Sequence, residues 1–255
     1  MNNITKKSLI AAGVFAAVSA LAGNAAFAAT VPAGVELAAK QELVRGNGDE
    51  VQSLDPHKIE GVPEDNVARD LYEGLLVNDS NGKPIPGVAE SYENKDFKVW
   101  TFHLRKNAKW SNGEPVTAQD FVYSWERLVD PKTASPYASY PQYGHILNVD
   151  DIIAGKKPIT DLGVKAIDDH TLEVTLSEPV PYFDKLLINS VMSPVYKPAI
   201  EKFGEQWTQP QNWVGNGAFK LDAHVINERI TLVRNPNYWD NAHTVEQGHL
   251  PANQF

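Results

Sequence analysis

The chain of 255 residues contains no cysteine. This absence excludes disulfide bonds, thiolate nucleophiles, zinc–thiolate sites and iron–sulfur clusters, because each of them needs cysteine sulfur. A chain without disulfides depends on its hydrophobic core for stability, and 42% of these residues are hydrophobic. The length allows one large domain or two small ones.

Several catalytic signatures are also missing. The sequence has no GxSxG elbow, P-loop or GxGxxG motif, which disfavours a serine hydrolase, an ATPase and a Rossmann enzyme. The seven histidines show neither HExxH nor another metal-ligand spacing. We therefore predict no catalytic residues, no metal and no cofactor.

Positive charge is in short supply. The formal net charge is -9, and the first 28 residues contribute Lys6 and Lys7 but no acid, so the rest of the chain is more negative still. Nucleic-acid binding rests on basic groups that contact phosphates, so this balance argues against a nucleic-acid partner.

The only long apolar run lies near the start of the chain. Lys6 and Lys7 precede apolar residues 9–22, and Ala26-Phe27-Ala28 forms a small-residue cleavage site. This order is typical of a secretory signal peptide, and the run is short for a membrane span. We predict that residues 1–28 are a cleavable export signal and that the mature chain does not insert into the membrane. Because no cysteine at the cleavage site could carry a lipid, a Gram-negative periplasmic location is favoured.

Hydrophobic periodicity predicts both strands and helices, without a regular βαβ rhythm. This pattern indicates an α/β (mixed α+β) fold with mixed sheets. We expect strands at residues 42–45, 98–104, 218–221 and 229–234, and a hairpin at residues 164–176. We expect helices at residues 64–76, 146–154, 181–191 and 198–204, and another that begins after Thr117.

The segment from residue 98 to residue 128 gives the sharpest local signals. Trp100, Phe102 and Leu104 alternate with polar residues, as in a half-buried strand. Thr117 followed three residues later by Asp120 resembles a capping box, so a helix should begin there with an apolar stripe.

Six segments together carry a family resemblance. They are DPHKIEGV at 55–62, YEGL at 72–75, PGVAES at 86–91, WTFHLR at 100–105, KWSNGEPVTAQD at 109–120 and KAIDDHTLEVTL at 165–176. In this order they resemble the family 5 extracellular solute-binding proteins, the capture subunits of ABC peptide importers. The first and last segments narrow the resemblance to oligopeptide-binding members.

The resemblance implies a periplasmic-binding-protein type II clamshell, in which a peptide is held between two lobes. Residues 29–72 would begin the first lobe, 73–196 would form a subsidiary inserted domain, and 197–244 would return to the first lobe. Residues 235–242, NPNYWDNA, still resemble the family, whereas residues 245–255 form a divergent tail. We expect that the chain lacks the second lobe, as in a truncated or frameshifted product, and that its function is impaired.

The resemblance also implies the binding residues. A binder that tolerates many sequences must hold the peptide backbone, as strand addition does. Val62 would supply main-chain hydrogen bonds, with Glu60 and Gly61 beside it, and Tyr137 would reach the peptide from the subsidiary domain. Considered without the resemblance, residues 60–62 read as an ordinary solvated loop. The implied partners are oligopeptides and the membrane permease subunits of an importer, with the chain itself a monomer.

Three other functions remain open at this stage. The ligand could be a murein peptide, a dipeptide, haem or nickel, as in specialised relatives. A holdase-like periplasmic chaperone is favoured only by the apolar surface that an open half-site would expose. A periplasmic hydrolase would need a nucleophile and a base, for which the sequence offers no constellation.

Overall fold

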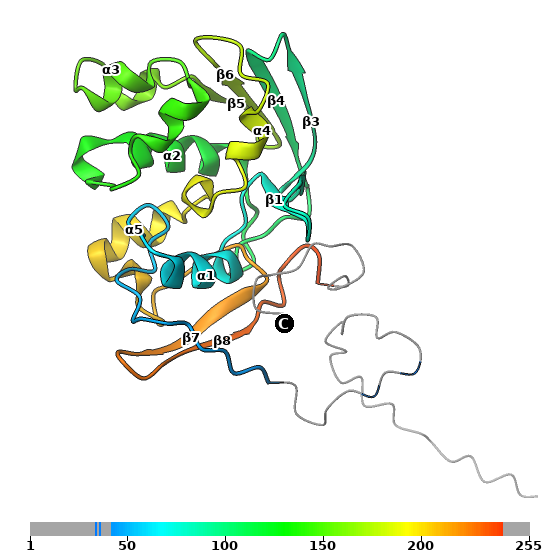
Figure 1. The fold of residues 1–255 in the computed structure, drawn as a ribbon, viewed down its shortest axis with the longest axis vertical. Helices are drawn as coiled ribbons and strands as arrows, with labels where there is room; N and C mark the ends of the chain where they lie inside the picture. Colours follow the sequence, from blue (N-terminus) through cyan, green and yellow to red (C-terminus); the bar gives the residue numbers. More distant parts are fainter. Residues whose placement is uncertain (1–33, 35, 37–41, 242–255) are drawn as a thin grey trace, which may run out of the picture.

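The computed structural model of the chain describes residues 34, 36 and 42–241, so the predicted signal peptide and the predicted tail at 245–255 lie outside the described residues. The described part mixes helices with antiparallel sheets (Figure 1). The helices are α1 (Val62–Leu71), α2 (Ala118–Val129), α3 (Val149–Ile153), α4 (Phe183–Leu186) and α5 (Lys197–Phe203). The strands are β1 (Leu76–Asn78), β2 (Pro84–Pro86), β3 (Ala89–Lys95), β4 (Val99–Leu104), β5 (Val164–Asp168), β6 (Thr171–Thr175), β7 (Phe219–Val225) and β8 (Arg229–Arg234).

The largest sheet has four strands in the order β3-β4-β6-β5, all antiparallel. In β4 the alternation predicted from the sequence is confirmed, because Trp100, Phe102 and Leu104 are buried and the residues between them are half-buried. Trp100 pairs with Val174 and Phe102 with Leu172, so the two inner strands present one apolar face. Helices α2 and α3 lie beside this sheet (Figure 1).

Helix α2 begins where the sequence predicts. Thr117 is the residue before the first helical turn, and the Asp120 carboxylate accepts hydrogen bonds from the Thr117 amide at 2.8 Å and its hydroxyl at 3.0 Å. Phe121, Trp125 and Leu128 are fully buried, which confirms the predicted stripe. The helix therefore combines a cap with one apolar face.

We expect Asp120→Ala to lower the free energy of unfolding by about 1–2 kcal/mol, because the Thr117 amide loses its acceptor at the helix start. Asp120→Asn keeps one acceptor oxygen and should lose less than half as much. Urea unfolding followed by circular dichroism measures both values. An Asp120→Ala variant as stable as the parent chain would show that the capping interaction does not stabilise α2.

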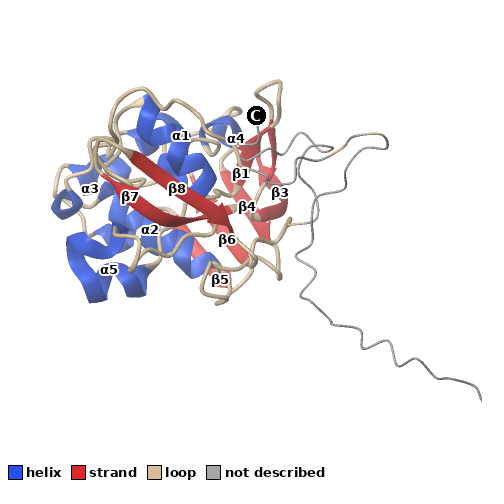
Figure 2. Cartoon of the chain, turned by 90° about the horizontal axis from the view of Figure 1, so that it is seen from below, coloured by secondary structure: helices blue, strands red, loops and turns tan. Residues whose placement is uncertain are grey.

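The chain returns to α1 after residue 213. The amide of Gly217 donates to the Leu71 carbonyl at 3.0 Å, and the Asn216 side chain bonds both backbone groups of Glu73, at 2.8 and 3.0 Å. A side chain at Gly217 would collide with the backbone of Asp70 and Leu71, which accounts for glycine there. Strands β7 and β8 then form a hairpin, which lies at the lower end in Figure 1 and in front in Figure 2, where the molecule is seen from below.

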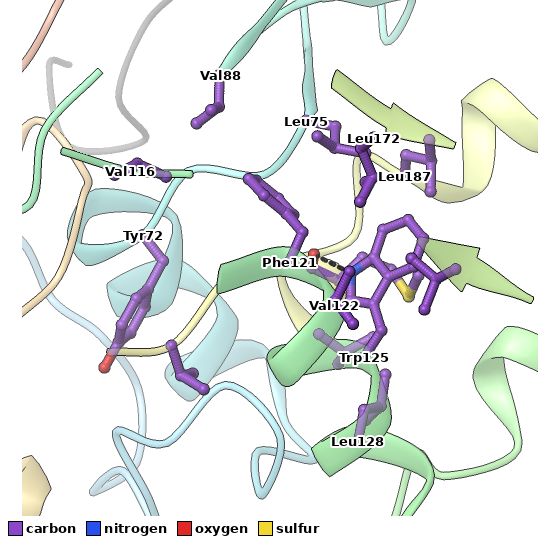
Figure 3. Packing of buried hydrophobic residues seen from close by; sticks show 14 of the residues in the cluster. Tyr72, Leu75, Val88, Val116, Phe121, Val122, Trp125, Leu128, Leu172 and Leu187 are labelled. Carbon is purple, nitrogen blue, oxygen red and sulfur yellow. Dashed lines mark hydrogen bonds between the residues drawn. The ribbon is translucent and has the colours of Figure 1, made fainter. Parts of the chain in front are cut away.

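The buried side chains form one hydrophobic cluster that runs from α1 through α2 to the sheet. Figure 3 shows Phe121, Trp125 and Leu128 of α2 in this cluster, with Leu75 and Leu172 nearby. The indole N–H of Trp125 donates to the buried carbonyl of Met192 at 2.9 Å. The segment after α4 is thereby joined to α2.

Several predicted elements are wrong. Residues 42–47 form no strand, and Val44 is 95% exposed, because no neighbouring strand pairs with this segment in the described part of the chain.

The predicted helix at 64–76 is α1, which ends at Leu71, since Tyr72 is extended and Leu76 begins β1. The predicted helix at 181–191 is split into α4 and a short 3-10 helix, because Asn189 is extended and its side chain accepts from the amide of Val191. Within the described residues every strand pair is antiparallel, so the expected mixed sheets are not found there.

Strand β3 was not predicted from the sequence. Its residues, AESYENK, are mostly polar, and all but Ala89 and Tyr92 are exposed. A strand with so little buried surface has no clear period-two pattern of hydrophobic residues. Its place at the edge of the sheet, paired on one side with β4, explains the polarity.

Candidate functional site

The predicted peptide-lining residues stand at the start of α1. Gly61 is extended, with φ of -110° and ψ of 169°, and Val62 is the first helical residue rather than part of the loop. The Val62 side chain is 73% exposed. The first amides of a helix lack an intrahelical acceptor. The Val62 N–H can therefore donate to a carbonyl outside the helix. Pro63, which follows, has no amide hydrogen to offer.

The Glu64 side chain anchors the first turn of α1. Its buried carboxylate accepts the Gln52 amide at 2.9 Å, which joins the chain before the loop to the first turn of α1. A negative group at this place is also favoured by the helix dipole. A β-carbon at Gly61 would collide with the Glu64 carboxylate, so a larger residue there would have to displace the end of the Glu64 side chain.

Tyr137 meets the same turn from a segment 77 residues away. Its phenol donates to the carbonyl of Glu60 at 3.5 Å, the long limit of a hydrogen bond. The Tyr137 ring is half-buried and lies 6.4 Å from the ring of Tyr140. The structure thus brings Tyr137 to Glu60, while the Glu60 side chain remains exposed.

A buried charged cluster that the sequence did not reveal fixes the loop before Glu60. Arg127 of α2 donates to both carboxylate oxygens of Asp55, from Nη2 to Oδ2 at 2.6 Å and from Nη1 to Oδ1 at 3.0 Å. Nη1 also lies 2.7 Å from Nδ1 of His57. We call these three residues the loop clamp. The position of Arg127 beside the apolar stripe of α2 was the one sequence feature that could have indicated its burial. Nothing in the sequence indicated that Asp55 and His57 contact it.

Burial and the charge of Arg127 together determine the protonation states of Asp55 and His57. Burial opposes ionisation of Asp55, but the hydrogen bonds and charge of Arg127 outweigh it, and the pKa of Asp55 lies below its usual value. Burial, and then the Arg127 charge, lower the pKa of His57 from 6.5 to about 3. Because arginine only donates, the neutral His57 ring accepts at Nδ1 and carries its proton on the buried Nε2.

Two features that the described residues lack bear on the candidate site. Among the described residues no group of three or more histidine, aspartate or glutamate side chains could hold a metal ion. In the same part of the chain, no helix is long and apolar enough to cross a membrane. A cavity of about 120 Å³ lies between α1, β1 and the segment before α5, and none of the four predicted site residues lines it.

Comparison with known proteins identifies similar sequences and folds. Residues 83–251 match the family described as bacterial extracellular solute-binding proteins, family 5 Middle. The chain is 74% identical over 245 residues to the periplasmic oligopeptide-binding protein OppA of Salmonella typhimurium, covering 96% of this chain and 45% of that protein. It is 51% identical to the periplasmic murein peptide-binding protein MppA of Escherichia coli, covering 89% and 43%.

The fold resembles part of a solved peptide complex. The crystal structure of Haemophilus influenzae OppA with the peptide RPPGFSPFR matches with a TM-score of 0.79 and 56% identity, over 81% of this chain and 40% of that one. The present chain thus spans under half the length of the relatives it matches.

Proposed function

The chain belongs to the bacterial extracellular solute-binding proteins, family 5, and we propose from this premise that it takes part in oligopeptide capture for an ABC importer. The observation that carries the proposal is the 74% identity, over nearly the whole chain, to a protein named for oligopeptide binding. The lower identity to the murein peptide-binding relative favours general oligopeptides as ligands. The capture would take place in the periplasm, without catalysis, and the peptide would pass to membrane permease subunits.

The turn at residues 60–62 would contact the peptide backbone. The Val62 N–H would donate to a peptide carbonyl, as in strand addition, while the exposed Glu60 carboxylate would lie alongside. Tyr137 would approach from the neighbouring segment, which is supported by its phenol lying 3.5 Å from the Glu60 carbonyl. Gly61 would let the turn pack closely on Glu64.

The domain division proposed from the sequence assigns residues 29–72 and 197–244 to a first lobe and 73–196 to a subsidiary domain. The bond between Gly217 and Leu71 supports the return of the chain to its starting lobe. The four-stranded sheet and α2 fall wholly within residues 73–196, as expected for an inserted unit. The binding turn, as we call residues 60–62, and Tyr137 would then come from different domains.

Calorimetric titration of the purified chain with a mixture of short lysine-containing peptides tests the proposal. Size-exclusion chromatography first checks the predicted monomer, and circular dichroism checks folding. We expect saturable heat with peptides and none with the equivalent free amino acids. A folded chain that binds no peptide would overturn the proposal.

Two variants of Val62 test its role. Val62→Pro removes the N–H at the first helical position, where proline is well accepted, so the helix should persist. Losing one hydrogen bond should weaken peptide binding by up to about tenfold. Val62→Ala keeps the N–H and is the matched control, with affinity expected within about threefold. Equal binding by Val62→Pro and the parent chain would exclude this main-chain contact.

A further inference from the structure

The loop clamp is almost closed to solvent. The Arg127 side chain is 13% exposed and the Asp55 side chain 4%, and His57 is fully buried. The paired contacts between the guanidinium and the carboxylate fix both position and orientation, since a fork geometry allows one relative placement. Arg127 stands on α2, in the unit proposed to be inserted, whereas Asp55 stands in the loop leading to the binding turn. The clamp therefore joins the two.

The loop is also closed locally around Asp55. The carboxylate accepts the His57 amide at 3.0 Å, and the Asp55 carbonyl accepts the Lys58 amide at 2.8 Å. On the N-terminal side, the Tyr72 phenol donates to the Leu54 carbonyl at 3.0 Å. Ile59 is buried immediately before Glu60. Residues 54–59 are thus held at several points, and two of these are hydrogen bonds to Asp55 itself.

Restraints become weaker after Ile59. The Glu60 side chain is exposed, its carbonyl meets Tyr137 only at 3.5 Å, and Val62 projects into solvent. The position of the Val62 N–H thus depends on the residues on either side of it. Glu64 follows it and bonds to Gln52, and the fixed loop at residues 54–59 precedes it. If the loop before Glu60 were mobile, a peptide would have to order it on binding, at a cost in conformational entropy.

We propose that Arg127 and Asp55 are positioning residues, which hold residues 58–62 in the conformation that receives the peptide backbone. This inference rests on the proposed function and deepens it, because neither side chain would touch the peptide. A buried ion pair is weak evidence of stabilisation, since a well-packed apolar replacement is often as stable. The contacts between Arg127 and Asp55 are directional and fit one loop conformation. An apolar pair at this place would not supply such a directional restraint.

The variant Arg127→Lys tests the inference. Lysine keeps the positive charge but cannot make the two-pronged contact with Asp55. Arg234→Lys is the matched control, since Arg234 also makes two hydrogen bonds, at 3.1 and 3.0 Å, but on the surface of β8. For each variant, amide hydrogen exchange is measured without peptide, and peptide affinity is measured by calorimetry.

We expect Arg127→Lys to exchange the amides of residues 58–62 about tenfold faster, with β4 and β6 unchanged, and to bind peptide about tenfold more weakly. Arg234→Lys should match the parent chain in both. Unchanged exchange at residues 58–62, or faster exchange with unchanged affinity, would overturn the inference. Asp55→Asn provides a second route to the same loss if Arg127→Lys does not fold. Failure of the parent chain to bind peptide would overturn the proposed function instead, and the exchange result would still decide whether the clamp orders the loop.

Discussion

Replacing Trp125 with alanine is expected to lower the free energy of unfolding by about 4–6 kcal/mol. Trp125 is fully buried on α2, and its ring packs edge-on against Phe121 with centroids 6.5 Å apart. Removing the ring leaves a cavity where α2 meets the segment after α4, within the cluster that Figure 3 draws. The carbonyl of Met192 also loses its donor, at 2.9 Å, in a place that water does not reach.

Urea unfolding followed by far-ultraviolet circular dichroism measures the loss without relying on tryptophan fluorescence. Trp125→Phe separates the two causes, because it keeps most of the volume but removes the N–H, and should cost about 1–3 kcal/mol. Tyr143→Ala is the control for loss of an aromatic ring at the surface, since Tyr143 is 63% exposed, and should change stability by less than about 0.5 kcal/mol. A Trp125→Ala loss below about 1.5 kcal/mol would contradict the packing described for α2.

The sequence predicts elements well where local chemistry and burial agree. Strand β4 was found because its alternation coincides with burial on one face, and α2 because Thr117 and Asp120 mark its start. Strand β3 was missed because a polar edge strand has no comparable signal. The false strand at 42–45 shows the converse, since an apolar pattern forms a strand only when a partner strand completes its hydrogen bonds.

The candidate site was predictable only in part, because its contacts join residues that lie far apart in the sequence. Residues 60–62 and Tyr137 came from the family resemblance, and no periodicity could have placed the Tyr137 phenol at the Glu60 carbonyl, 77 residues away. The contact of Arg127 with Asp55 spans 72 residues. A charged residue on an amphipathic helix usually lies in solvent, so its burial depends on tertiary packing that the local pattern does not encode.

Acid is expected to destabilise the protein through His57. In the unfolded chain His57 has a pKa near 6.5, whereas in the folded protein burial and Arg127 lower it to about 3. Between these values the unfolded chain binds a proton that the folded protein does not, so stability falls as the pH falls from 6.5 toward 3. Above 6.5 the ring is neutral in both states and contributes no pH dependence.

Comparison with His57→Gln isolates this contribution. The difference in unfolding free energy between the parent chain and His57→Gln should decrease by about 2–3 kcal/mol from pH 7 to pH 4.5, because one proton uptake is removed. Asp55, whose pKa is lowered from 3.8, is ionised in both states over this range and should not obscure the effect. His103→Gln serves as the control, since the His103 side chain on β4 is 41% exposed and is not part of the loop clamp. A constant difference across the range would mean that His57 is accessible to protons in the folded chain. The loop clamp would then be open to solvent, and the rigidity that it is proposed to give residues 58–62 would lose its structural basis.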